Sequence, residues 1–268
     1  MTGKGYVHGY TPREGERLVD QAATLAEILH QDTTYPAGST VLEAGCGVGA
    51  QTGILAGNSP EARFVSVDLS GESLRAARRG VSARGATNVT FLRSDIFRLP
   101  FRDESFDHVF LCFVLEHLRD PEGALSCLRR VLKRGGSITA IEGDHGSAFF
   151  HPDSAVARRA IRCLVDLQAG EGGNALIGRR LYPVLRASGF RDVSVSPRTV
   201  YADSGRPGLV EGFTKNTFTA MVEGVRERAL GAGMMSRDEW DRGIRDLYRT
   251  AEGDGTFVYT FFKGTARK

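Results

Sequence analysis

The sequence predicts an α/β fold in which a mostly parallel β-sheet carries helices on both faces. Two observations support this prediction. Short runs rich in apolar and β-branched residues alternate with segments of helical periodicity over most of the 268 residues, and regular alternation of this kind is typical of a parallel sheet. A glycine-rich turn in the segment TVLEAGCGVGAQ (40–51) directly follows the first expected strand, as in proteins that bind nucleotides at a strand-to-helix turn.

The expected elements follow one another in a regular order. A helix precedes the glycine turn, because leucines and alanines recur at helical spacing over 13–30. Seven strands are expected from apolar or alternating runs at 40–42, 64–68, 88–92, 106–110, 137–142, 193–197 and 256–263. Helices are expected at 71–84, 121–132, near 155–169 and at 176–187, with further helical segments in 207–250.

The rhythm of strands and helices changes after residue 142, which indicates inserted segments. Inserted helices that follow late strands should form a lid above the carboxyl ends of the sheet, where doubly wound proteins bind ligands. The expected organisation is an N-terminal arm and helix that act as a cap (1–37), a nucleotide-binding core (38–142), a lid insertion (143–175), a continuation of the core (176–206), a helical lid (207–250) and a C-terminal core strand (251–268).

Composition argues against several classes of protein. No apolar run approaches the ~20 residues of a membrane helix, and the first residues lack the apolar segment of a secretory signal, so no membrane partner and a cytoplasmic location are expected. A net charge of +3 with dispersed arginines does not indicate a nucleic-acid partner. The four cysteines are scattered without metal-ligand spacing, so neither a metal site nor a disulfide framework is expected.

The glycine turn by itself leaves two nucleotide cofactors open. The spacing Gly45-x-Gly47-x-x-Ala50 also fits the dinucleotide fingerprint, so NAD(P) is one alternative. Asp68 ends the second expected strand ~20 residues beyond the glycines, where a carboxylate can accept hydrogen bonds from both ribose hydroxyls of an adenosine. Either cofactor would use such a residue.

Several further stretches favour one of these cofactors by resemblance. EAGCGVG, VDLS at the second expected strand, SDIFRLPF after the third, FDHVFLCFVLEHL through the fourth and LKRGGSITAIE into the fifth resemble, in this order, the motifs of class I S-adenosylmethionine (SAM)-dependent methyltransferases. The nearest general type is the ubiquinone/menaquinone-biosynthesis methyltransferases, and the resemblance covers residues 38–142. It implies the Rossmann-like seven-stranded fold of that family, methyltransferase activity, SAM as cofactor and S-adenosylhomocysteine (SAH) as product.

The resemblance also implies roles for individual residues around SAM. Glu43, Gly45 and Gly47 would form the floor under its methionine part, and Asp68 would hold the ribose hydroxyls. The other implied contacts are Leu69 against adenine, Asp95 at the exocyclic amine with Ile96 alongside, and Cys112 and Phe113 near the sulfonium. Two of these roles have simpler alternatives, because an aspartate after a strand also caps turns and a cysteine is also a small core residue.

The segment after the fifth expected strand is the predicted catalytic region. Glu142, Asp144 and His145 leave this strand at its carboxyl end, beside the expected position of the transferred methyl group. We expect His145, alone or with Glu142, to act as general base, and Asp144 to meet the substrate. The alternative is that these residues only shape the loop. For Glu116 and His117 a structural role in the loop after the fourth strand is expected.

Aromatic residues late in the chain predict an apolar pocket for a small, flat substrate. The residues expected to line it are Phe149, Phe150, Tyr201, Phe213 and Phe218, although an aromatic stripe at helical spacing is also typical of ordinary core packing. Tyr10 lies in the segment GYVHGY (5–10). This segment is expected to be either a surface arm or a flap over the bound ligand, in which case Tyr10 contacts the cofactor.

A finer resemblance concerns the substrate. GYVHGYTPREGERL, AGCGVGAQT, FVLEHL, IEGDHGS and TFVYTFFK are together similar to actinobacterial natural-product methyltransferases, some of which methylate indole C3 of tryptophan-containing cyclic dipeptides with closure to a pyrroloindoline. This implies C-methylation of an indole. The alternatives are an O- or N-methyltransferase of another small metabolite and a SAM-binding protein without catalysis. The sequence leaves the oligomeric state open.

Overall fold

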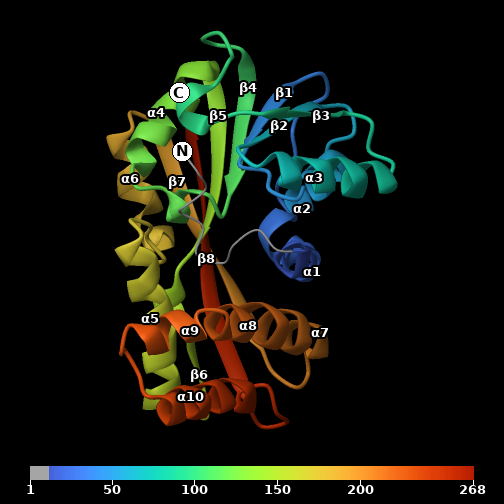
Figure 1. Ribbon diagram of the computed structural model, residues 1–268. Coiled ribbons are helices and arrows are strands. Elements are labelled where there is room, and N and C mark those ends of the chain that lie inside the picture. The colour runs from blue at the N-terminus through green and yellow to red at the C-terminus, as the bar shows by residue number, and fades with distance from the viewer. Residues whose placement is uncertain (1–11) are drawn as a thin grey trace.

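One mixed sheet runs the length of the molecule, as Figure 1 shows. The computed structural model describes residues 12–268. Within this range the sheet has eight strands in the order β3-β2-β1-β4-β5-β8-β6, and β7 also pairs with β8. Strands β1 to β5 are parallel, whereas β8 is antiparallel to β5, β6 and β7. The predicted α/β fold with a mostly parallel sheet is confirmed.

The strands and helices lie close to the expected positions. The strands are β1 (Thr40–Ala44), β2 (Arg63–Asp68), β3 (Val89–Arg93), β4 (Phe106–Cys112), β5 (Leu132–Gly143), β6 (Phe149–His151), β7 (Arg191–Ala202) and β8 (Thr256–Arg267). The α-helices are α1 (Pro12–His30), α2 (Ala50–Asn58), α3 (Gly71–Ala83), α4 (Pro121–Val131), α5 (Ala155–Gly170), α6 (Leu181–Ala187), α7 (Pro207–Leu209), α8 (Ala220–Glu223), α9 (Arg226–Gly231) and α10 (Arg237–Arg249). None of the helices that the structure describes is long and apolar enough to cross a bilayer.

Helices cover both faces of the sheet in the core. Val41 and Leu42 are neighbours in β1 and both are fully buried. Val41 packs in the apolar cluster that contains Leu29 of α1 and Leu55 of α2, while Leu42 packs with the residues of α4 and α6, which Figure 1 shows on the opposite side of the sheet. A central strand buried on both faces reads as a continuous apolar run, which explains the apolar start of TVLEA.

The sheet is longer at the β8 edge than the sequence pattern indicates. The short strand β6 was not expected, and it exists because Phe149 and Phe150 pair with Val258 and Phe257 of β8. β7 likewise extends well beyond 193–197, because β8 gives it a partner along almost its whole length. Since β5 and β6 lie along one edge of β8 and β7 along the other, the sheet is still seven strands wide.

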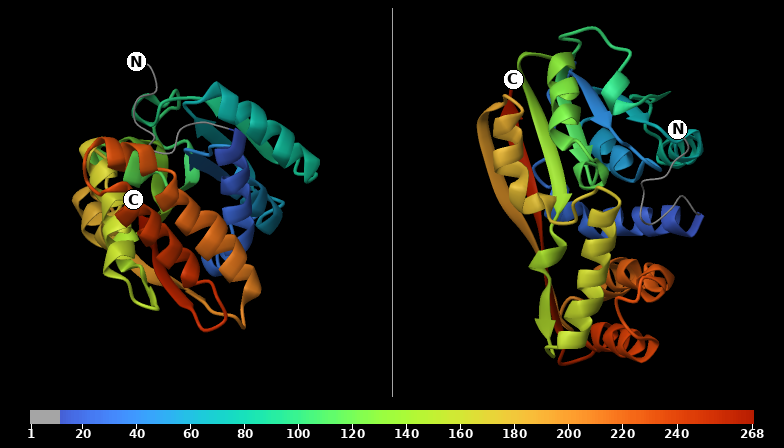
Figure 2. Two further views of the ribbon diagram at one scale, coloured as in Figure 1. Left: turned by 60° about the horizontal axis from the view of Figure 1, so that its bottom comes forward. Right: turned by 60° about the vertical axis from the view of Figure 1, so that its left-hand side comes forward.

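The inserted helices gather at the end of β8 that is remote from β1, β2 and β3, as Figures 1 and 2 show. Leu164 of α5 and Trp240 of α10 are fully buried in the same cluster. The segment η5 (Val210–Thr219) is a π-helix, and Gly212 allows it to approach α1, since a Cβ there would lie 2.3 Å from Thr24 Oγ1. Helices occupy the segments expected to form a lid, and their role as a lid and the division into core and lid stay predictions.

Candidate active site

The glycine turn after β1 needs glycine for two physical reasons. Gly45, Gly47 and Gly49 have φ values of 77°, 52° and 77°, in the left-handed region that side chains disfavour. A Cβ on Gly45 would lie 2.6 Å from Val114 Cγ2, whereas a Cβ on Gly47 would meet nothing within 4 Å. The backbone at Gly47 therefore faces open space, as a ligand lying along the turn requires.

Asp68 joins the end of β2 to this turn. One carboxylate oxygen accepts a hydrogen bond from Gly47 N at 2.8 Å, and the other accepts from Ser70 N at 2.8 Å. Burial raises the pKa of Asp68 above its ordinary value. The neighbouring Leu69 is 56% exposed, so an apolar side chain stands uncovered beside the turn.

Glu43 lies beneath the turn and is turned into the protein. Its Oε2 accepts hydrogen bonds from Thr52 Oγ1 and Ser66 Oγ, both at 2.6 Å. Burial raises the pKa of Glu43 to about 7. The observed contacts of Glu43 are thus to the scaffold of the turn, which fits a place in the floor.

The residues after β3 and β4 have the local roles that their sequence also allowed. Asp95 caps the short 3₁₀ helix η1 (Ile96–Arg98), because its Oδ1 accepts from Phe97 N at 2.9 Å. Cys112 is buried, and burial together with Glu142 raises the pKa of its thiol, so it is an inert apolar neighbour. Phe113 has φ of 58°, a strained conformation for a phenylalanine and one that is typical of functional sites.

Glu142 holds the turn η2 (Leu115–His117) in place from the end of β5. Its carboxylate accepts hydrogen bonds from the backbone N–H groups of Val114, Leu115 and Glu116, at 3.0, 2.8 and 3.4 Å. Glu142 is fully buried, and burial and the nearby Glu116 raise its pKa to about 8. Its oxygens are directed at backbone donors, as in the alternative that this residue shapes the loop, and a role of Glu142 as general base stays a prediction.

His145 is a buried histidine held by a buried tyrosine. Its Nδ1 lies 2.7 Å from the hydroxyl of Tyr259 in β8, and its ring makes an edge contact with Phe218 at 6.1 Å between centroids. Burial lowers the pKa of His145, which favours the neutral imidazole over the charged form.

The carboxylate of Asp144 is paired within the protein. Its carboxylate is ion-paired with the guanidinium of Arg179, with an Nη2 to Oδ1 distance of 2.8 Å, and Oδ1 also accepts from Gly146 N at 3.0 Å. The side chain is 2% exposed. The carboxylate of Asp144 is thus satisfied by Arg179, a partner that lies 35 residues away in sequence, and a contact of Asp144 with the substrate stays a prediction.

Five rings form one aromatic cluster between His145 and the end of β4. The shortest contacts between ring centroids are 4.7 Å for Tyr259 and Phe261, and 4.9 Å for Phe218 and Phe257. Phe213 contacts the other four rings, and Phe113 lies 5.3 Å from Phe261. The aromatic cluster therefore consists of Phe213, Phe218, Phe257, Tyr259 and Phe261, and Phe150 stacks on its Phe257.

Phe149 and Tyr201 lie on the other face of the sheet. Both pair with Val258 in register, while Phe257 and Tyr259, on either side of Val258 in β8, point into the aromatic cluster. Because neighbouring residues in a strand point to opposite faces, the two side chains are directed away from the cluster, and they are 57% and 41% exposed. Their expected place in the substrate pocket is corrected.

Gln168 and the loop that follows α5 lie against η2, which the sequence did not indicate. Gln168 of α5 donates from Nε2 to Glu116 O at 3.0 Å, and Asn174 N donates to the same oxygen at 2.7 Å. A Cβ on Gly173 would lie 2.6 Å from Glu116 O, so the loop that follows α5 packs closely against η2. The pair Glu116 and His117 was visible in the sequence, whereas no local signal distinguishes Gln168 from any helical glutamine.

Two predictions concern the N-terminal segment and metal ions. Tyr10 and the rest of GYVHGY fall outside the described residues. Within residues 12–268 no group of three or more histidine, cysteine, aspartate or glutamate side chains is arranged to hold a metal ion.

The raised pKa of Glu142 leads to a prediction about stability. A carboxyl whose pKa is higher in the folded than in the unfolded protein stabilises the fold fully below its unfolded value, and that contribution is lost as the pH rises through the folded value. For Glu142 this window runs from its ordinary value of 4.5 to about 8. Glu142→Gln cannot ionise, so its free energy of unfolding should improve relative to wild type as the pH rises from about 5 to about 8.

Urea denaturation across this pH range measures the difference. Glu61→Gln serves as the control, since Glu61 is exposed. A constant difference between Glu142→Gln and wild type would contradict the assignment of a raised pKa.

Comparison with known proteins identifies the family. Residues 42–140 match the family model described as a methyltransferase domain. A demethylmenaquinone methyltransferase of Geobacillus stearothermophilus is 31% identical over 60% of this chain and 75% of that protein. A malonyl-[acyl-carrier protein] O-methyltransferase of Herminiimonas arsenicoxydans is 36% identical over 90% of this chain and 83% of that protein.

Two further similar proteins concern the length of the chain and its fold. An uncharacterized 37.1 kDa protein in a transposon of Streptomyces fradiae is 35% identical over 81% of this chain and 59% of that protein. This chain therefore spans less than two thirds of the length of that relative. A crystal structure of geranyl diphosphate C-methyltransferase from Streptomyces coelicolor, in complex with Mg²⁺, geranyl diphosphate and SAH, matches with a TM-score of 0.53 at 16% identity, over 92% of this chain and 78% of that one. At this identity the likeness concerns the fold.

These findings confirm the general resemblance and set NAD(P) aside. The chain belongs to the SAM-dependent methyltransferases, a family of enzymes whose cofactor is SAM.

Proposed function

We propose that this protein transfers a methyl group from SAM to a small aromatic molecule, and that the acceptor is indole C3 of a tryptophan-containing cyclic dipeptide or a related indole. The observation that carries this proposal is the pairing of His145 with Tyr259 at the edge of the aromatic cluster. Stacked and edge contacts from aromatic side chains suit a flat ring, and they exclude water.

The residues around the glycine turn fit the cofactor. The open space at Gly47, with Gly45 beside it and Glu43 beneath, suits the methionine part. We propose that Asp68 holds the ribose and that the exposed Leu69 covers adenine. The further contacts that we propose are Asp95 and Ile96 at the adenine edge and Cys112 and Phe113 near the sulfonium. When bound, SAM supplies an activated methyl group, so the protein's chief task is to position the acceptor.

His145 is proposed as the proton acceptor. The base must be the tautomer whose Nδ1–H donates to the Tyr259 hydroxyl, with 2.7 Å between these atoms, because Nε2 then has a free lone pair for the substrate proton. Methylation of indole C3 with closure to a pyrroloindoline releases one proton from nitrogen, and a neutral imidazole can take it. Glu142 contributes by holding η2 rather than by proton transfer.

Two other functions remain as alternatives. A relative is named for O-methyl transfer, so an O- or N-methyltransferase of another small metabolite is one. A SAM-binding protein without catalysis is the other. We further propose a cytoplasmic protein without a nucleic-acid partner, which the modest net charge of +3 supports.

Turnover on defined acceptors tests the proposal. The purified chain is incubated with SAM and with cyclo(L-Trp-L-Trp), a phenol or an aliphatic amine, and products are identified by mass and NMR. We expect a product of the cyclic dipeptide that carries one new methyl group on C3. Methylation only at oxygen or nitrogen would favour the first alternative, and SAH binding without any product would favour the second.

Asp68→Ala should weaken SAH binding by about 1–3 kcal/mol, because a buried hydrogen-bond acceptor for the ribose is lost. Isothermal titration calorimetry measures the change. Asp20→Ala, at an exposed position of α1, controls for the loss of a negative charge. An SAH affinity that equals that of wild type would remove Asp68 from the ribose site.

His145→Ala should slow single-turnover methyl transfer by about 10²-fold, the usual loss when a general base is removed, while SAH affinity stays near that of wild type. Tyr259→Phe should slow it less, since the imidazole stays in place without its partner. Phe149→Ala is the matched control, because Phe149 lies on the outer face. An unchanged rate in His145→Ala would exclude it as the base.

A further inference from the structure

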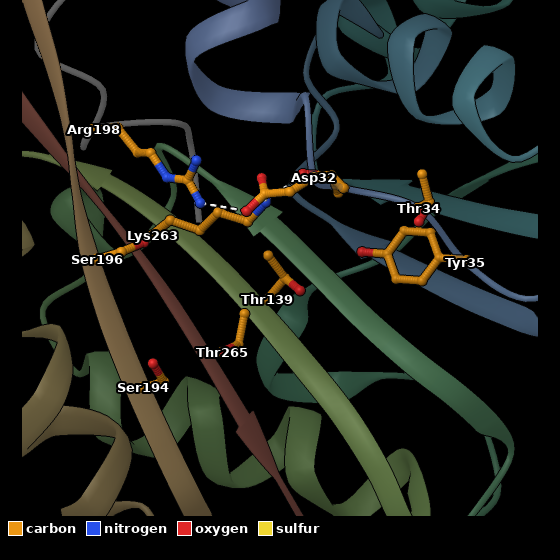
Figure 3. A pocket seen from close by; sticks show the side chains of 10 residues that line it. Asp32, Thr34, Tyr35, Thr139, Ser194, Ser196, Arg198, Lys263 and Thr265 are labelled. Atoms are coloured by element: carbon orange, nitrogen blue, oxygen red, sulfur yellow. Dashed lines mark hydrogen bonds and ion pairs between the residues drawn. The ribbon is translucent and has the colours of Figure 1, made fainter.

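A polar cavity of about 210 Å³ lies apart from the candidate active site. It lies between the loop that follows α1 and the strands β5, β7 and β8, and Figure 3 shows the side chains around it. Its lining shares no residue with the glycine turn, with η2 or with the aromatic cluster. A ligand in this cavity would therefore leave the proposed methyl-transfer site free.

Strand pairing gathers hydroxyl groups on one wall of the cavity. Thr139 of β5, Thr265 of β8 and Ser194 of β7 are directly opposite one another in register, so their side chains share one face of the sheet. Ser196 is opposite Lys263 in the next row on the same face. Each hydroxyl can donate one hydrogen bond and accept others.

The charged groups of the cavity leave one positive charge in excess. Lys263 Nζ uses its donors inside the protein, to Asp32 Oδ1 at 2.6 Å, Thr33 Oγ1 at 2.6 Å and Leu29 O at 3.5 Å. Arg198 donates from Nη2 to the other oxygen of Asp32, an interaction drawn in Figure 3. Two cations thus share one carboxylate.

Arg198 has an unused donor at this place. Its Nε is buried and has no hydrogen-bond partner among residues 12–268, and its side chain is 15% exposed. A buried donor without a partner is costly, and a guanidinium N–H forms its strongest hydrogen bonds with carboxylate or phosphate oxygens. An acceptor from outside the chain would satisfy this N–H.

We propose that this cavity is a binding site for a small oxyanion, a carboxylate or a phosphate, with Arg198 Nε as the charged donor and the hydroxyls of Thr139, Ser194 and Ser196 as the surrounding donors. The excess positive charge disfavours a cation. The hydroxyl-rich wall disfavours an apolar ligand.

An anion here would brace α1 against the sheet. Lys263 and Asp32 tie the carboxyl end of α1 to β8, and His30 Nε2 lies 2.7 Å from Gln51 Oε1, in the first turn of α2 beyond the glycine turn. We expect the bound anion to stabilise the folded protein through mass action.

Calorimetry and thermal unfolding with inorganic phosphate and with acetate, in separate arms at constant ionic strength, test the proposal. We expect saturable binding of one or both anions at about 10 mM or below, with a matching rise in the unfolding temperature. The arm that binds identifies the source of the oxyanion. Absence of saturable binding in both arms would overturn the proposal.

Variants locate the site. Arg198→Gln should weaken anion binding by about tenfold or more, and Ser196→Ala, which keeps every charge, should weaken it by a few-fold. Arg242→Gln, at an exposed position of α10, should bind as wild type does. Equal affinities in wild type, Arg198→Gln and Ser196→Ala would show that the anions bind elsewhere and would overturn the assignment.

Discussion

The candidate active site depends on the hydrogen bonds that the buried side chain of Glu142 accepts. The carboxylate accepts hydrogen bonds from three consecutive backbone N–H groups of Val114, Leu115 and Glu116, and so joins the end of β5 to the turn that follows β4. Burying a carboxyl group is unfavourable unless it is hydrogen-bonded. The same three bonds fix the path of the chain after Phe113, whose left-handed backbone needs a surrounding structure to hold it.

Strand β8 links this part of the site to the aromatic cluster and to α1. Phe257, Tyr259 and Phe261 form one side of the aromatic cluster, and Lys263, next on the same face, holds the end of α1. Alternate residues of this one strand therefore contact the inserted helices, hold His145 through Tyr259 and line the polar cavity. Because a strand has a period of two, its other face carries Val258 between the exposed Phe149 and Tyr201.

The parts of the site that were predictable have local causes. The turn at Gly45 and Gly47 was evident because strand, glycines and helix follow one another directly, and the position of Asp68 at the end of β2 beside this turn was evident for the same reason. The roles of Glu142 and Asp144 were not evident, since their partners are the backbone of η2 and Arg179, distant in the chain. Gln168 could not be found either, because its contact with Glu116 spans 52 residues.

By itself the sequence determined the order of the strands and helices up to β5, the parallel core, the glycine turn and the methyltransferase family, because periodicity and ordered motifs are properties of neighbouring residues. Only the tertiary structure decided which way the polar and aromatic side chains point. Phe150 and Phe149 are adjacent in sequence and alike in chemistry, yet one is buried on Phe257 and the other is 57% exposed. Pairing with β8 makes that choice, and the register of two strands more than 100 residues apart is set by packing across the whole sheet.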